Sequence, residues 1–300
     1  MCTSDSVAPI NTTHLHLYAP QVQQAVTRLL ASHDSVQHRY MSLGWMARVA
    51  GDAARYEDMC KVVRELVLTR DATVPPSSTE RNLVLEAYAG VIGPRRTALQ
   101  TLRDTMDNPD DALGHNILVA YRAQIASELK SVCQEAMELV RNHMATHTKP
   151  NTEAHVLDLK MCADYARYIV ECTDDPIYSV EAATCYQQAA TLAAKLLEPT
   201  HPTRLSVALN QSVFLFDTMN QRQDAIRLAK VTFDQAMIGL HHLSATTHTQ
   251  SVEAMKLIRD NIIMWSANDE DDDGCLTNTN HHPPPLSDQT DELHTTTPPV

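Results

Sequence analysis

The fold of this 300-residue chain is decided by the stretch Glu80-Arg-Asn-Leu-Val-Leu-Glu-Ala-Tyr-Ala-Gly-Val-Ile-Gly-Pro-Arg-Arg96. Its apolar residues recur at helical spacing and predict one long helix from about Ser78 to Met106. Pro94 departs from that pattern, because proline lacks the N–H that would bond the carbonyl of Gly90 and its ring clashes there. We expect a cost of about 3 kcal/mol or a kink, and a kink would re-aim Arg96.

The segments on either side are also predicted to be helical, and none of them is convincing as a strand. The expected helices are Leu43–Asp52, Ala54–Thr69, Asp111–His143, Asn151–Cys172, Ser179–Leu197, Thr200–Met219, Arg222–Leu240 and Thr247–Trp265. With the first helix this gives about nine, so the fold class is all-α, an antiparallel bundle. No fixed 34-residue period appears, which makes a regular solenoid the weaker interpretation.

Three regions follow from the composition along the chain. Residues 1–40 form a polar, His-rich extension with one candidate short helix, Pro20–Ser32. Residues 41–266 form the helical domain. Residues 267–300 begin acidic and end in Pro, His and Thr, and we expect them to be disordered because they cannot bury enough apolar area.

Composition excludes several classes of protein. Only 7 of the 300 residues are Gly, roughly 2% of the chain, whereas about 7% is usual. This scarcity disfavours Gly-rich phosphate loops and turn-rich β folds. The net charge of −13 includes eight acids after Ser266, and no Lys/Arg stripe suggests a nucleic-acid track. Seven scattered cysteines without a C-x-x-C, and no apolar run of about 18 residues, predict a cytoplasmic protein with no membrane partner.

Four further stretches occur in a fixed order after the opening one: Leu159–Tyr168 (LKMCADYARY), Pro199–Leu205 (PTHPTRL), Ala208–Phe214 (ALNQSVF) and Leu257–Trp265 (LIRDNIIMW). Together the five motifs resemble the 14-3-3 family over roughly Leu43 to Trp265. The resemblance implies a cup of helices with an amphipathic ligand groove. It also implies a non-enzymatic adaptor without a cofactor, whose partners are phosphorylated proteins.

The phosphate site that the resemblance implies contains Arg96, Arg167, Tyr168 and Lys160. Arginine suits a phosphate because its planar fork donates parallel hydrogen bonds and keeps its charge. Lys160 and Asp164 share a helix face with Arg167, at i, i+4 and i+7, so Asp164 is expected to hold a guanidinium in place. Taken without the resemblance, the same row reads as a surface ion-pair series.

The rest of the groove is expected to hold an extended peptide. Asn210 and Asn261 match family asparagines that bond the main chain of the ligand, since an amide both donates and accepts. Without the resemblance, the helical stripes beside them would be read as core. The expected groove residues besides the two asparagines are Leu209, Val213, Asp217, Leu257, Met264 and Trp265.

Several positions depart from the family pattern. Ala89 stands where the family has a third-helix lysine, so one cation is missing, and Lys160 is the residue that could compensate. Glu253 and Ala254 replace large apolar groove residues. Together with Pro94, these changes support an alternative: a degenerate scaffold with weak or phospho-independent protein binding.

The resemblance also implies a homodimer. A small-residue patch at Val49, Ala50 and Ala53 would face Ala98, Leu102 and Tyr121 of a second copy, and Arg55 and Glu128 match a family intersubunit salt bridge. Because exposed ion pairs contribute only about 0–1 kcal/mol, apolar burial should decide whether the dimer forms.

Metal and enzyme chemistry are not predicted. His143 and His147 are spaced i, i+4 but lack the Glu of H-E-x-x-H and an evident third ligand. No Ser/His/Asp or Cys/His arrangement stands out in a chain with 15 histidines.

Overall fold

A computed structural model describes residues 28, 36–71, 73–106, 112–239 and 245–272. Within these ranges the chain is all-α, as expected, and no strand occurs. The α-helices are α2 (Val36–Asp52), α3 (Tyr56–Thr69), α4 (Ser78–Met106), α5 (Ala112–Leu139), α6 (Glu153–Thr173), α7 (Pro176–Leu196), α8 (Pro202–Val213), α9 (Arg222–Gly239) and α10 (Ala245–Asp272).

Most helix boundaries lie close to the expected ones, and the largest differences fall at the two ends. Helix α2 begins at Val36, seven residues before the expected Leu43, and α10 continues past Trp265 to Asp272. Residues 36–40 and 267–272 are therefore helical rather than parts of an extension and a tail. The candidate helix Pro20–Ser32 lies outside the described residues apart from Arg28, and so do residues 273–300 of the tail.

Helix starts follow local capping chemistry. The Thr152 side chain accepts a hydrogen bond from the His155 N–H at the start of α6, and Asp175 does the same for Ile177 at the start of α7. Pro176 and Pro202 occupy the first turns of α7 and α8, where a missing N–H costs little.

Two helices end in a π-helical turn. One spans Val140–Met144 after α5, and a 3₁₀ turn, Ala145–His147, follows it. The other spans Phe214–Thr218 after α8 (η4), where the Met219 N–H bonds the Phe214 carbonyl at 3.1 Å. Such turns occur often at functional sites, and η4 carries Asp217.

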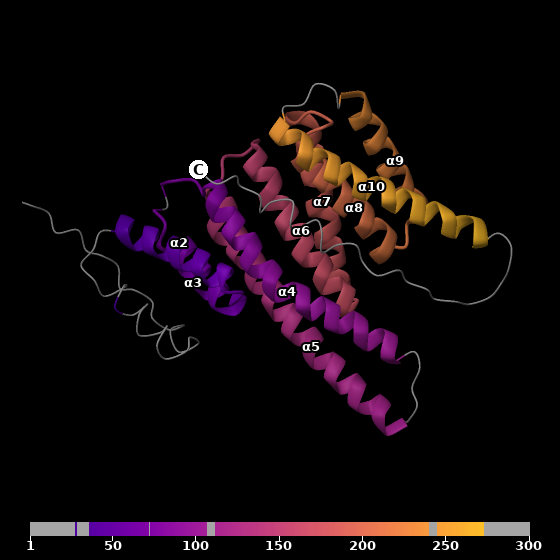
Figure 1. The fold of residues 1–300 in the computed structure, drawn as a ribbon, viewed down its shortest axis with the longest axis horizontal. Helices are drawn as coiled ribbons and strands as arrows, with labels where there is room; N and C mark the ends of the chain where they lie inside the picture. Colours follow the sequence, from indigo (N-terminus) through magenta and orange to yellow (C-terminus); the bar gives the residue numbers. More distant parts are fainter. Residues whose placement is uncertain (1–27, 29–35, 72, 107–111, 240–244, 273–300) are drawn as a thin grey trace, which may run out of the picture.

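Consecutive helices pack against each other, and the core has two main parts. Figure 1 shows α2 and α3 at one end, the long pair α4 and α5, then α6 and α7, and α8 to α10 at the other end. The larger cluster of buried apolar residues runs from α2 to α7, and a second lies among α8, α9, α10 and η4. Every residue from Lys160 to Val170 on α6 is buried, so any charge within this stretch needs an internal partner.

Helix α4 continues unbroken through Pro94. The proline is exposed, and Arg96, two residues later, still points into the protein with 7% of its side chain exposed. Pro94 therefore does not turn Arg96 away from Glu171.

Candidate functional site

The two arginines expected to bind phosphate converge on one carboxylate. Arg96 on α4 places its Nε and Nη2 each 3.1 Å from Glu171 Oε2, while Arg167 Nη1 on α6 donates to Glu171 Oε1. Both guanidinium carbons also lie over the ring of Tyr168, at 4.3 Å and 4.5 Å from its centroid. The arrangement is an anion site that Glu171 occupies in this structure.

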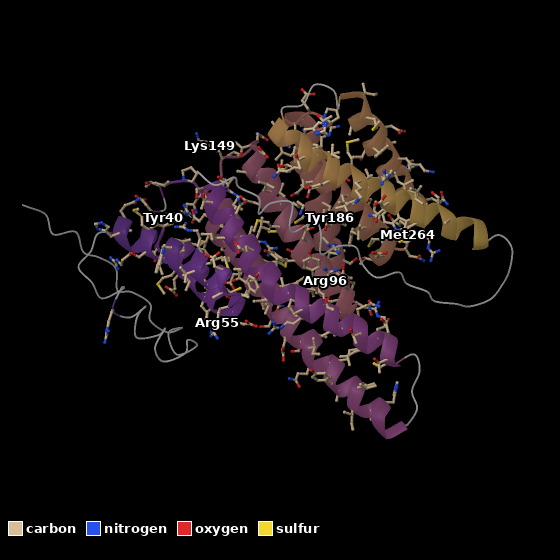
Figure 2. All side chains as sticks on the ribbon, viewed as in Figure 1. Tyr40, Arg55, Arg96, Lys149, Tyr186 and Met264 are labelled. Carbon is tan, nitrogen blue, oxygen red and sulfur yellow. The ribbon has the colours of Figure 1, made fainter. Side chains whose placement is uncertain are left out.

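Lys160 and Asp164 belong to a buried polar cluster that is connected to Arg167 through Tyr186. Lys160 Nζ donates to Asp164 Oδ2 at 2.7 Å, and Asp164 Oδ1 accepts from Tyr186 OH at 2.5 Å. Arg167 Nε in turn donates to Tyr186 OH at 3.2 Å. The expected contact between Asp164 and a guanidinium is therefore indirect: the tyrosine hydroxyl of α7 stands between them. Figure 2 shows Tyr186 and Arg96 near the middle of the molecule.

Both carboxylates are held in their charged form. Burial alone would raise the pKa of Glu171, but the Arg96 and Arg167 guanidiniums outweigh burial and hold that pKa below its ordinary value. Burial likewise opposes ionisation of Asp164, and the nearby Lys160 and Arg167 charges reverse the effect and lower its pKa. Near neutral pH, Arg96, Arg167 and Lys160 are thus already paired with internal anions.

Asn210 serves the same cluster. Its side-chain amide is 2% exposed and donates to Asp164 Oδ1 at 2.9 Å. The donor expected to bond the main chain of a peptide is therefore directed at a neighbouring carboxylate in this structure. The bond to Asp164 uses one of the two N–H groups of this amide.

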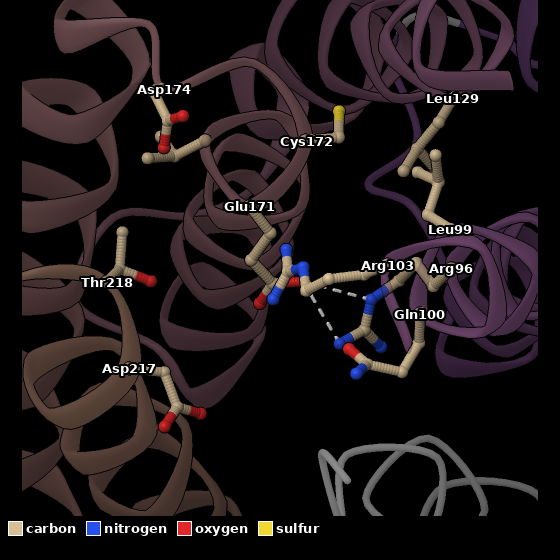
Figure 3. Close-up of a pocket in the computed structure, with 11 residues that line it drawn as sticks. Arg96, Leu99, Gln100, Arg103, Leu129, Glu171, Cys172, Asp174, Asp217 and Thr218 are labelled. Atoms are coloured by element: carbon tan, nitrogen blue, oxygen red, sulfur yellow. Dashed lines mark hydrogen bonds and ion pairs between the residues drawn. The ribbon is translucent and has the colours of Figure 1, made fainter. Parts of the chain in front are cut away.

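A cavity of about 250 Å³ opens beside Glu171. Glu171 has 26% of its side chain exposed, whereas Arg167 has 1%, so Glu171 is the member of the cluster that an incoming group meets. Figure 3 shows the polar lining of this cavity. The lining contains two arginines, one glutamine and three acids: Arg96, Arg103, Gln100, Glu171, Asp174 and Asp217. The lining is thus mixed in charge, and the positive charge comes entirely from α4.

The other expected groove residues lie on α8, η4 and α10. Leu209, Leu257 and Trp265 are buried in the second core cluster, and Trp265 stacks on Phe216 at 4.5 Å with 11° between the rings. Val213 and Met264 are half-buried at its edge. Asn261 is buried, and Asp217 is exposed at the cavity. Their contact with a ligand stays a prediction.

The residues expected at a dimer interface differ in exposure. Val49, Ala53, Arg55, Tyr121 and Glu128 are exposed, Ala50 and Ala98 are half-buried, and Leu102 is buried. Within one chain, Arg55 Nε donates to Asp58 Oδ2 at 2.8 Å, and Glu128 lies 3.4 Å from Arg95 Nε. An intersubunit pair between Arg55 and Glu128 would have to exchange with these contacts.

No group of three or more His, Cys, Asp or Glu side chains among the described residues is placed to hold a metal ion. None of the described helices is long and apolar enough to cross a membrane.

Sequence reasoning missed four residues of this region: Glu171, Tyr186, Gln100 and Arg103. Glu171 carried a usable signal, because it follows Arg167 by four residues and so shares its helix face. Gln100 and Arg103 follow Arg96 by four and seven residues on α4, which is the same kind of signal. Tyr186 carried none, since its role depends on how α7 packs against α6.

Comparison with known proteins identifies relatives for most of the chain. A family model described as "14-3-3 protein" matches residues 46–266. The 14-3-3 protein theta of Mus musculus and that of Rattus norvegicus are each 35% identical over 227 residues, covering 74% of this chain and 90% of the relative. The Gallus gallus theta protein is 34% identical over the same length. The matched range agrees with the range of the resemblance, roughly Leu43 to Trp265.

Proposed function

Because the chain belongs to the 14-3-3 family, we propose that it is a non-enzymatic, cytoplasmic adaptor that binds segments of partner proteins carrying phosphoserine or phosphothreonine. One observation carries the proposal. Two guanidiniums from separate helices, Arg96 and Arg167, share a single anion over the ring of Tyr168.

The phosphate takes the place of the Glu171 carboxylate in this proposal. A phosphoserine carries close to two negative charges and three acceptor oxygens, against one charge and two oxygens for a carboxylate. It therefore gains more from Arg96 and Arg167 than Glu171 does. Glu171 borders the cavity and is the most exposed group of the cluster, so its side chain is the one that an entering phosphate would displace.

The peptide around the phosphate then lies toward α8 and α10. Asn210 and Asn261 are the amides that would bond its main chain, and Val213 and Met264 are the half-buried apolar residues that a ligand side chain would reach. Lys160 supports the site through Asp164 rather than by direct contact, because its ammonium is 2% exposed and bound to that carboxylate.

The test is fluorescence anisotropy with a panel of dye-labelled peptides, each with one central phosphoserine, and their unphosphorylated counterparts. We expect the phosphorylated forms to bind more tightly, and Arg167→Ala to remove most of that preference. Loss of one charge-assisted contact should weaken binding by about ten- to a hundred-fold.

The matched control is Arg95→Ala. Arg95 is on α4 but faces Glu57 and Glu128, at 3.7 Å and 3.4 Å, away from the site. This variant removes the same charge and should keep the preference. Circular dichroism must show that Arg167→Ala stays folded, because the arginine is buried.

The alternative is a family scaffold that binds proteins without requiring phosphate. Two features favour it: Ala89 supplies no cation, and Glu171 already neutralises part of the charge of Arg96 and Arg167. Equal affinity for both peptide forms, unchanged by Arg167→Ala, would establish this second function.

A further inference from the structure

Arg103 is a cavity-lining cation for which the described residues supply no counter-ion. It is half-buried on α4, borders the same cavity as Arg96 and Glu171, and has no ion pair or hydrogen bond with any residue that the structure describes. Figure 3 draws its side chain extending from α4, as those of Arg96 and Gln100 do. By contrast, Arg96, Arg167 and Lys160 each bind an acid.

The position of Arg103 follows from helix geometry. Arg96, Gln100 and Arg103 are spaced i, i+4 and i+7, which places them on one face of α4. All three line the cavity. Any anion that enters to reach Arg96 therefore passes along the same helix face as Arg103.

The balance of charge requires one more cation. Arg96 and Arg167 together match a phosphate that is close to doubly charged, but the displaced Glu171 carboxylate stays nearby with its own negative charge. Position 89, where a lysine would supply the missing charge, is alanine. Asp174 and Asp217 add negative charge to the lining, but both are exposed and therefore better screened by solvent.

We propose that Arg103 is a phosphate contact of this groove, supplying from the cavity side the charge that Ala89 does not provide. This inference rests on the proposed function. It makes Arg96, Arg103 and Arg167 a three-arginine set, with two members from α4 and one from α6.

The experiment measures the affinity of the full chain for the best phosphoserine peptide at fixed ionic strength. We expect Arg103→Gln to weaken binding by about ten- to a hundred-fold, and Arg103→Lys to recover part of the loss because it restores charge without the planar fork. Arg95→Gln, the charge-matched control on α4 whose side chain faces Glu57 and Glu128, should change affinity by less than about twofold.

Competition by inorganic phosphate separates a phosphate contact from a contact elsewhere on the peptide. If Arg103 holds the phosphate, Arg103→Gln should need about tenfold or more additional inorganic phosphate to displace the same fraction of peptide. An Arg103→Gln protein that matches Arg95→Gln in both measurements, while Arg167→Ala still removes the phosphate preference, overturns this inference and leaves the proposed function intact. If the unaltered chain shows no preference for phosphorylated peptides, both are wrong.

Discussion

At the scale of single residues, Glu171 determines how readily the site accepts an external anion. It is bound by Arg96 and Arg167, and its lowered pKa keeps it charged at neutral pH. We expect Glu171→Gln to bind phosphopeptides about three- to tenfold more tightly, because the amide keeps the shape but not the competing charge. Anisotropy with the same peptides would measure the affinity of this variant. The control is Glu181→Gln, since Glu181 is an acid on α7 that pairs with Arg141. Weaker binding by Glu171→Gln would mean that the carboxylate positions the arginines rather than competes for them.

At the scale of elements, the seating of α3 on α4 depends on one glycine. A Cβ at Gly90 would lie 2.1 Å from the ring of Tyr56, whereas a Cβ at Gly93 meets nothing within 4 Å. We expect Gly90→Ala to lower the free energy of unfolding by about 1–3 kcal/mol through overpacking. Gly93→Ala should instead raise it by about 0.5–1 kcal/mol through helix propensity. Urea denaturation measures the free energy of unfolding of both variants. An equal change in that free energy for Gly90→Ala and Gly93→Ala would contradict the assigned role of Gly90.

At the scale of the whole molecule, exposed apolar residues on α2 support the expected homodimer. Met41, Trp45 and Val49 are spaced four residues apart and are 62%, 60% and 43% exposed, so one face of the helix is apolar and uncovered. We expect light scattering at micromolar concentration to give the mass of two 33.4-kDa chains, and Trp45→Glu to give one. Ile177→Glu on α7, at a site that is 72% exposed, should leave the mass unchanged. A single-chain mass for the unaltered protein would rule out the dimer.

Most helices and the two central arginines could be predicted from the amino-acid sequence alone. Helical periodicity is a local property, and the five motifs lie in continuous stretches, so the bounds of α3, α4 and α9 and the positions of Arg96 and Arg167 were accessible without a structure. The start of α2 and the end of α10 could not be predicted in this way. The mostly polar stretch Val36–Tyr40 and the acidic residues up to Asp272 carry little helical signal of their own.

The partner of each buried charged group depends on the tertiary structure. Glu171 between the two arginines, Tyr186 between Arg167 and Asp164, and Asn210 on Asp164 all depend on the packing of α4, α6, α7 and α8. Partners on different helices are separated by 19 to 75 residues along the chain, and no local pattern fixes such pairs. Buried charges select partners by distance in the folded interior, where an unpaired charge is costly, and that selection exists only after the helices have packed.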